Sequence, residues 1–331
     1  MYNTSLKILR LLPPELSHTI TINFLKYFKV RQKNIEDSIL SQHLMGLDFP
    51  NPIGLAAGFD KNAEVMHSMF SFGFGFLEVG TITPQPQSGN SKPRVFRLSE
   101  DKAIINSLGF NNKGIKKVKK NLIKHQKSYL NNKIVGVNIG KNKNSSEAID
   151  DYLIGLEELG DLASYITINI SSPNTEGLRD LQLRGKIEKL IKISPDLNED
   201  QLRDIALISL ANNIDGLILT NSTIKRESNL ISINKGKKGG LSGKPLYNNS
   251  NIILKKMYDL TNGQIPLIGV GGISSGKDCY EKIKSGASLV QLYTALVYSG
   301  PNLINRMKGD LIDLIKTDGY KNVSEVIGKS V

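Results

Sequence analysis

The chain has 331 residues, of which 39% are hydrophobic, and it carries a formal net charge of +12 with a pI near 9.5. This length and composition exclude a disordered chain, and they predict either two average domains or one large α/β barrel with an extension. The single cysteine, Cys279, excludes an intramolecular disulfide and is typical of a reducing compartment. Because Cys279 lies in an amphipathic stretch, a buried, unreactive thiol is expected rather than a nucleophile.

The excess of lysine is spread along the chain. In the segment 113–127 the lysines fall between the apolar positions of a predicted helix, which is typical of a solvated basic face. Attraction to anionic lipid is the second interpretation of the charge. Nucleic acid is the third, and no such partner is expected, because the sequence has no zinc-ligand spacing and no RNA-binding signature.

The N-terminal segment 1–45 predicts a short, basic helical pair that is broken at Pro13-Pro14. Its apolar residues recur every four positions, at Leu16, Ile20, Phe24 and Phe28. No apolar run approaches the roughly 18 residues of a membrane-spanning helix, and no secretory cleavage site follows an apolar core. Two interpretations remain equal: an amphipathic extension that lies in a membrane interface, or a helical cap on the main domain.

From residue 46 to residue 331, apolar strands alternate with polar loops and helices. Such alternation predicts parallel pairing, and the number of strands predicts a closed (β/α)8 TIM barrel. An extra hairpin, 95–98 with 103–106, is predicted between the second and third units. The predicted strands are 53–57, 74–82, 134–139, 165–170, 190–193, 216–220, 266–270 and 289–292.

Helix starts are predicted from capping residues. The helix that contains Ile149 and Tyr152 follows a possible cap at Ser145 or Ser146. The helix after Asn198 has Gln201 three residues later, which is a capping-box pattern.

The stretch YITINISSPNTEGLR (165–179) places hydroxyl and carboxamide groups at the end of one strand, where the chemistry of a barrel belongs. Pro173 ends the strand because proline has no backbone N–H to donate to a neighbouring strand. The alternative interpretation of these polar side chains is a turn in which they only bond to their own backbone. The other strand ends carry Gly, Asn, Thr, Ser and Lys, without paired carboxylates, a His/Cys cluster or a Ser-His-Asp set. This pattern disfavours metal-dependent or triad hydrolysis and favours a flat, hydrogen-bonding heterocycle.

Two glycine-rich segments, 239–243 and 269–274, predict a phosphate site, because glycine lets backbone N–H groups approach an anion. A helix start at Ser274 or Ser275 adds the attraction of its dipole.

The chain resembles the class 2, quinone-dependent dihydroorotate dehydrogenases, which are flavin enzymes of pyrimidine synthesis. The N-terminal PELSHTITINFLK resembles the extension that separates class 2 from class 1, and Ser172 stands where class 1 enzymes have a catalytic cysteine. The matching segments are NPIGLAAGFDKN, GTITPQPQSGNSKPRVFRL, INSLGFNNKG, YITINISSPNTEGLRDLQ, GGLSGKPL, IGVGGISSG and GASLVQLYTAL.

The resemblance implies that FMN lies over the barrel mouth, with Lys192 as an electrostatic partner of the reduced flavin. Ser172 would act as the base that removes the C5 proton of dihydroorotate while the C6 hydride passes to the flavin. The implied cofactor residues are Ala57, Gly58, Phe59, Asp60, Lys61, Thr81, Asn138, Asn169, Lys192, Thr220, Gly243, Gly272, Tyr293 and Thr294. The implied substrate residues are Lys61, Asn106, Ser107, Leu108, Gly109, Phe110, Asn169, Asn174, Asn221 and Ser222.

The resemblance further implies a quinone tunnel lined by His18, Arg97 and Tyr293. The expected partners are dihydroorotate, orotate, a membrane quinone and membrane lipid. A monomer attached peripherally to the cytoplasmic face of the cell membrane is expected, without a metal.

Three departures from the family pattern accompany the resemblance. Ser107 replaces a usual arginine and Ser222 a usual threonine. The third departure is a short crossover, because only about twenty residues separate Ser171 from Leu190. This leaves 183–190 for the crossover helix and makes closure of the barrel possible but tight. The alternatives are therefore an FMN barrel enzyme with another substrate, such as a dihydrouridine synthase, or a family member inactivated by the short 171–190 crossover.

Overall fold

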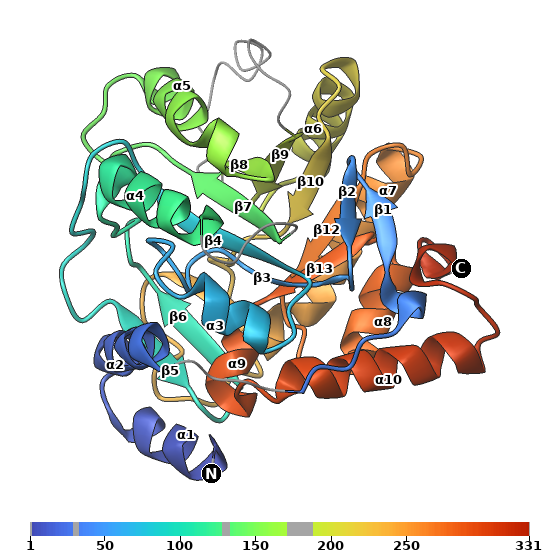
Figure 1. Ribbon diagram of the computed structural model, residues 1–331, viewed down its shortest axis with the longest axis horizontal. Helices are drawn as coiled ribbons and strands as arrows, with labels where there is room; N and C mark the ends of the chain where they lie inside the picture. Colours follow the sequence, from blue (N-terminus) through green and yellow to red (C-terminus); the bar gives the residue numbers. More distant parts are fainter. Residues whose placement is uncertain (1, 29–32, 128–132, 171–187, 331) are drawn as a thin grey trace.

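The computed structural model describes residues 2–28, 33–127, 133–170 and 188–330. Eight parallel strands close into a barrel, and helices surround it, so the predicted (β/α)8 fold is confirmed (Figure 1). Around the barrel the order is β10, β12, β13, β3, β4, β7, β8 and β9, and β9 pairs again with β10. The barrel strands are β3 (Ile53–Leu55), β4 (Phe76–Ile82), β7 (Ile134–Ile139), β8 (Tyr165–Asn169), β9 (Glu188–Ile193), β10 (Gly216–Leu219), β12 (Leu267–Val270) and β13 (Leu289–Leu292).

The predicted strands agree with these bounds within two residues at each end. Strand β9 starts earlier than expected, because Glu188 and Lys189 pair with Tyr165 and Ile166 of β8. The prediction that the crossover helix extends to residue 190 is therefore wrong, since 188–190 belong to the barrel wall. The rest of the crossover, 171–187, lies outside the described residues.

Helices cover the outside of the barrel, and their inward faces form one apolar layer with the strands. The capping box of α6 is confirmed, because the amide of Gln201 donates to Asn198 Oδ1 at 2.9 Å and the amide of Asn198 to Gln201 Oε1 at 3.0 Å. The predicted serine cap of α5 is wrong, because its N-cap is Glu147. The outer elements are α3 (Met66–Ser71), α4 (Gly114–Gln126), α5 (Ala148–Leu159), α6 (Glu199–Ala211), α7 (Tyr247–Leu260), α8 (Gly276–Lys284), α9 (Thr294–Ser299), α10 (Leu303–Thr317) and the 3₁₀ turns η1 (Ser38–Leu40), η2 (Gly160–Leu162), η4 (Lys244–Leu246) and η5 (Val323–Val326).

A hairpin, β1 (Gln42–Leu44) with β2 (Leu47–Phe49), closes the amino-terminal end of the barrel. Phe49 of this hairpin packs edge-on against Phe76, with ring centroids 5.3 Å apart, above a cluster of buried side chains inside the barrel. The predicted division of the chain after residue 45 falls in the turn of this hairpin. Because this end is filled with apolar side chains, a ligand site belongs at the other end.

A small antiparallel sheet stands beside the open end, formed by β5 (Val95–Leu98), β6 (Ala103–Asn106) and β11 (Gly240–Gly243). The hairpin β5–β6 was predicted, but β11 was not, because its sequence GLSG has no strand periodicity. Residues 240–243 of the predicted phosphate segment 239–243 are therefore part of a strand. The amide of Leu241 donates to the carbonyl of Thr223 at 2.7 Å.

The predicted N-terminal pair is confirmed as α1 (Tyr2–Leu11) and α2 (Pro14–Tyr27), with Pro14 in the first turn of α2. Helix α2 buries Ile22 and Leu25, whereas Leu16, Ile20 and Phe24 are 42–49% exposed. The predicted stripe is therefore partly exposed, and it borders the large cavity at the open end of the barrel. In the part of the chain that the structure describes, no helix is long and apolar enough to span a bilayer.

Candidate active site

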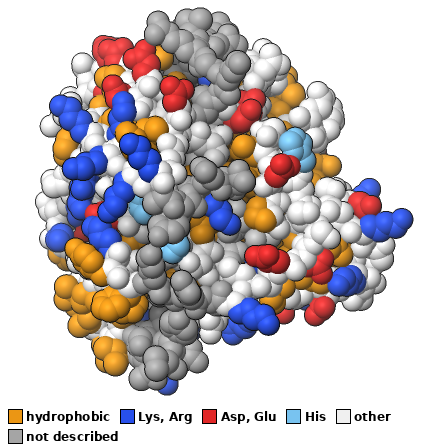
Figure 2. All heavy atoms as spheres, in the orientation of Figure 1, with side chains coloured by type: hydrophobic (Ala, Val, Ile, Leu, Met, Phe, Trp, Pro, Cys, Tyr) orange, Lys and Arg blue, Asp and Glu red, His pale blue; other side chains and the backbone are white. Residues whose placement is uncertain are grey.

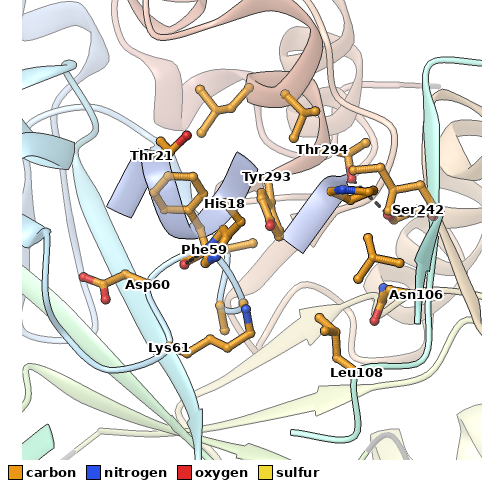
Figure 3. Close-up of a pocket in the computed structure, with 18 of the residues that line it drawn as sticks. His18, Thr21, Phe59, Asp60, Lys61, Asn106, Leu108, Ser242, Tyr293 and Thr294 are labelled. Atoms are coloured by element: carbon orange, nitrogen blue, oxygen red, sulfur yellow. Dashed lines mark hydrogen bonds between the residues drawn. The ribbon is translucent and has the colours of Figure 1, made fainter. Parts of the chain in front are cut away.

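A cavity of about 1790 Å³ opens at the carboxyl ends of the barrel strands and continues beneath α2 (Figure 3). A site for one drug-sized ligand is typically about 300–1,000 Å³. The cavity therefore has room for more than one ligand.

The floor of the cavity consists of polar side chains at the strand ends. Thr81, Asn169, Lys192 and Thr220 all line it. Asn169 donates from Nδ2 to Thr81 Oγ1 at 3.2 Å. Burial lowers the pKa of Lys192, and the neighbouring carboxylate of Glu78 opposes that shift.

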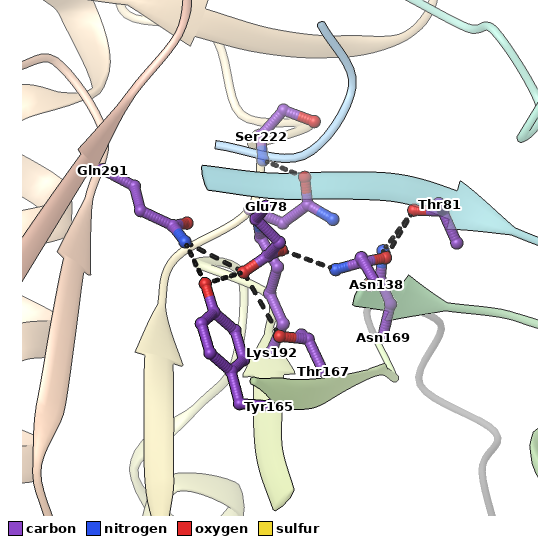
Figure 4. A network of polar contacts seen from close by, with 10 residues as sticks. Glu78, Thr81, Asn138, Tyr165, Thr167, Asn169, Lys192, Ser222 and Gln291 are labelled. Carbon is purple, nitrogen blue, oxygen red and sulfur yellow. Dashed lines mark hydrogen bonds and ion pairs between the residues drawn. The ribbon is translucent and has the colours of Figure 1, made fainter. Parts of the chain in front are cut away.

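Asn138 lies directly below this floor and is fully buried. Its Oδ1 accepts a hydrogen bond from Thr81 Oγ1 at 2.6 Å, and its Nδ2 donates to Glu78 Oε1 at 2.8 Å (Figure 4). Asn138 thus supports the floor without lining the cavity.

The loop after β3 forms one wall. The carboxylate of Asp60 accepts from the amides of Glu64 and Val65, each at 2.8 Å, which folds the loop back on itself, and burial raises the pKa of Asp60. The adjacent Lys61 lies beneath Phe59 in the cavity (Figure 3). Burial lowers the pKa of Lys61 to about 8, so that at neutral pH it is a cation at the cavity.

The segment after β6 and the loop after β10 form the opposite side. They bring Asn106, Ser107, Leu108, Gly109 and Phe110 to the cavity, together with Asn221 and Ser222. Carboxamides and hydroxyls gathered around one lysine can bind a carboxylate and the amide groups of a ring.

A glycine cradle lies at the far end of the cavity. Gly243, Gly271 and Gly272 have φ values of +100°, +116° and +76°, which side chains rarely tolerate. A Cβ on Gly272 would lie 2.6 Å from the amide nitrogen of Tyr247.

The start of α8 is occupied by its own side chains. Ser275 is the N-cap, as predicted, and Asp278 Oδ2 accepts from the amide of Ser274 at 2.8 Å. Side chains of α8 itself therefore satisfy amides at its N-terminus.

The passage beneath α2 is lined by aromatic rings. His18 packs edge-on to Phe59, and Phe59 packs edge-on to Tyr293, with both pairs of centroids 5.6 Å apart. Arg97 closes one side, where its guanidinium donates to the carbonyls of Arg10 and Leu12 at 3.1 and 2.6 Å. The three residues of the predicted tunnel thus share one cavity wall with α2.

All of the predicted site residues that the structure describes line the cavity, except Asn138, which lies below it. Ser172 and Asn174 lie outside the described residues. Among the residues that sequence reasoning missed, Ser242 contacts Thr294 at 2.9 Å between hydroxyl oxygens, and its segment GGLSG was the available signal. Gln291 was missed as well, and its Oε1 is buried at the cavity without a partner.

Sequence reasoning also missed an ion pair that holds α2. The buried Arg94 donates to Glu15 Oε1 from Nε at 3.1 Å and from Nη2 at 2.9 Å. Nothing local in the sequence joins these residues, which are 79 positions apart.

Comparisons with known proteins agree with this geometry. Residues 39–315 match the family model "Dihydroorotate dehydrogenase". The chain is 46% identical over 340 residues to the dihydroorotate dehydrogenase (quinone) of Parvibaculum lavamentivorans, covering 98% of this chain and 97% of the relative. It is 43% identical over 344 residues to the mitochondrial dihydroorotate dehydrogenase (quinone) of Mus musculus, covering 96% and 87%. A crystal structure of the Eimeria tenella enzyme in complex with ferulenol superposes with a TM-score of 0.89 at 41% identity, covering 96% and 95%.

Proposed function

The chain belongs to the dihydroorotate dehydrogenase family, and from this membership and the cavity we propose that it oxidises dihydroorotate to orotate, with FMN as the flavin and a membrane quinone as the electron acceptor. This is a step of de novo pyrimidine (UMP) synthesis. The observation that carries the proposal is one continuous cavity, which runs from the strand ends to the space beneath α2.

The residues at the strand ends fit an isoalloxazine ring. The ring carries carbonyl acceptors, for which Lys192 supplies a donor, and one N–H donor, for which the buried and unpartnered Oε1 of Gln291 is a matching acceptor. Asn169, whose Nδ2 donates to Thr81 and Asn138, borders the ring. The remaining contacts of the ring are assigned to Ala57, Gly58, Phe59, Asp60, Lys61, Thr81 and Thr220, with Asn138 behind them.

We assign the glycine cradle to the single phosphate group of FMN. Backbone groups at Gly243, Gly272, Tyr293 and Thr294 would hold this phosphate. When bound, FMN accepts two electrons from the substrate and delivers them to the quinone.

The substrate lies between the flavin site and the wall at 106–110. The ammonium of Lys61 binds the substrate carboxylate, and the carboxamides of Asn106, Asn169, Asn174 and Asn221 and the hydroxyl of Ser222 bind its ring. Gly109 and Phe110 exclude water. Ser172 takes the proton from C5; a serine needs help from its surroundings for this role, because its free pKa makes it a weak base.

The quinone enters beneath α2, between His18, Tyr293 and Arg97. Hydrophobic side chains gather at the lower left of Figure 2, over α1 and α2, and the exposed apolar residues of α2 include Leu16, Ile20 and Phe24. We assign these residues to contact with lipid, so that the protein is a monomer attached peripherally to the cytoplasmic face of the cell membrane.

A dihydrouridine synthase activity is not supported, because such enzymes rely on a cysteine at the site. Cys279, the single cysteine of the sequence, is fully buried in α8 and does not line the cavity.

The test is an anaerobic titration of the purified protein. A flavin absorbance spectrum that bleaches on addition of dihydroorotate and returns on addition of a quinone is expected, and the released cofactor should chromatograph as FMN. A protein without flavin, or a flavin that dihydroorotate does not bleach, would contradict the proposal and would favour a family member that has lost activity.

A further inference from the structure

One carboxylate inside the barrel has no role in the function proposed above. Glu78, in the middle of β4, has 0% exposure and does not line the cavity. Its Oε1 accepts from Asn138 Nδ2 at 2.8 Å and lies 3.9 Å from Lys192 Nζ, and its Oε2 accepts from Gln291 Nε2 at 2.9 Å, from Thr167 Oγ1 at 3.2 Å and from the Tyr165 hydroxyl at 3.4 Å (Figure 4).

Lys192 is the cation that faces this carboxylate. Of the other partners, Asn138, Thr167 and Gln291 are neutral, and burial raises the pKa of Tyr165 well above its usual value, so it is neutral too. A buried lysine without an anionic partner tends to lose its proton, whereas a nearby carboxylate opposes that loss. Glu78 therefore favours the charged form of a lysine that lines the cavity.

Glu78 also fixes the direction of a hydrogen-bond chain. The carboxylate oxygen of Glu78 accepts here, so Asn138 presents its Nδ2 to Glu78. The amide of Asn138 then presents Oδ1 to Thr81 Oγ1 at 2.6 Å and to Asn169 Nδ2 at 3.4 Å. Both Thr81 and Asn169 line the cavity, so the carboxylate sets which of their groups point to the ligand.

We propose that Glu78 is the positioning residue of the flavin site: it keeps Lys192 positively charged and orients Asn138, and through them it raises the reduction potential of the bound flavin. The inference rests on the proposed flavin site. Lys192 lies at the cavity and Glu78 behind it, so the nearer positive charge dominates at the flavin. A fixed positive charge in a site sheltered from water stabilises the negative charge that the flavin gains on reduction.

The first test is the flavin reduction potential of Glu78→Gln, measured by equilibration with redox dyes. The substitution keeps the size of the side chain and removes its charge. We expect the affinity for reduced relative to oxidised flavin to fall at least tenfold, which corresponds to about 30 mV for a two-electron couple. An unchanged or a higher potential would overturn the proposal.

The second test repeats the substitution in a Lys192→Met background. Without the lysine, removal of Glu78 only removes a negative charge, so the potential should rise rather than fall. This reversal of sign separates an action through Lys192 from a general loss of packing. A fall of the same size in both backgrounds would contradict the proposal. If Glu78→Gln alone fails to fold, the potential of Lys192→Met can still be compared with that of the double variant. Equal potentials in those two proteins would contradict the proposal.

Thr167→Val is the matched control. Thr167 does not line the cavity, and its substitution removes one hydrogen bond to the same carboxylate without changing the charge. It should keep the wild-type potential. A shift as large as that of Glu78→Gln would assign the effect to packing and contradict the inference.

Failure of this inference can be distinguished from failure of the proposed function. A wild-type flavin that dihydroorotate bleaches, combined with an unchanged potential in Glu78→Gln, contradicts only the role of Glu78.

Discussion

The imidazole of His18 lies 2.8 Å, measured from Nε2, from the carbonyl oxygen of Phe59, a residue 41 positions later in the chain. Because a carbonyl can only accept, His18 donates this hydrogen bond in its neutral form. Burial, with a contribution from Lys61, lowers the pKa of His18 to about 4, which keeps the ring neutral at physiological pH. The bond joins α2 to the loop after β3, so the wall of the proposed quinone passage and the wall of the proposed flavin site are held together at this point.

The first prediction concerns the pH dependence of stability. Between pH 6.5 and about 4 the unfolded chain gains a proton at His18 that the folded protein does not, so the stability due to this residue is present above pH 6.5 and is lost as the pH falls toward 4. In His18→Gln, which keeps an N–H donor but does not titrate, thermal unfolding should depend less on pH over this window.

Thr19→Ala, an exposed substitution on the same helix, is the control and should keep the wild-type dependence. Parallel curves for the wild type and His18→Gln would show that His18 titrates alike in the folded and unfolded states.

The second prediction concerns Lys61. Because burial lowers its pKa to about 8, the cation that binds the substrate carboxylate is lost as the pH rises through this value. The kcat/KM for dihydroorotate should therefore fall above about pH 8 in the wild type. In Lys61→Met it should be low at every pH, mainly through a higher KM. The exposed Lys117→Met should behave as the wild type, and a wild-type profile that is flat across pH 8 would exclude Lys61 from this role.

The third prediction concerns Ser172. The alanine variant should retain flavin but reduce it with dihydroorotate about 10²–10⁴-fold more slowly, which is the usual range for loss of a general base. Stopped-flow bleaching of the flavin measures this step directly. Ser172→Cys should keep partial activity with a shifted pH profile, because a thiol has a much lower pKa than a hydroxyl. Normal bleaching in Ser172→Ala would mean that another group takes the proton.

The fourth prediction concerns the exposed apolar residues of α2, which also border the cavity. Ile20 and Phe24 are 42% and 49% exposed, and their replacement by serine in one double variant should weaken binding to anionic vesicles. Reduction of long-tail quinones should fall, while bleaching by dihydroorotate and reduction of a short, water-soluble quinone should be retained. Ile252→Ser, at a 55% exposed position on α7, is the matched control. Unchanged vesicle binding would leave α1 and α2 as a structural cap.

The sequence by itself determined the local elements and the family. The alternation in 165–170 and the apolar runs of the other strands indicated the barrel. Strands of a parallel barrel are buried on both faces, so they need apolar or β-branched residues along their length. The Asn198–Gln201 capping box was readable for a similar reason, since its two partners lie three residues apart. The strand ends rich in glycine and asparagine located the cavity, because the carboxyl ends of all barrel strands lie at the same end of a (β/α)8 barrel.

Only the tertiary structure decided the pairings between distant residues. Glu78 is 114 positions from Lys192, Glu15 is 79 from Arg94, and β11 became a strand because β6 was available beside it. In the sequence, Glu78 is one charged residue within an apolar run, and nothing local reveals whether it is buried or what it faces. Burial of a charge is decided by the closure of the whole barrel, which brings the strands that carry Glu78, Asn138 and Lys192 around one interior.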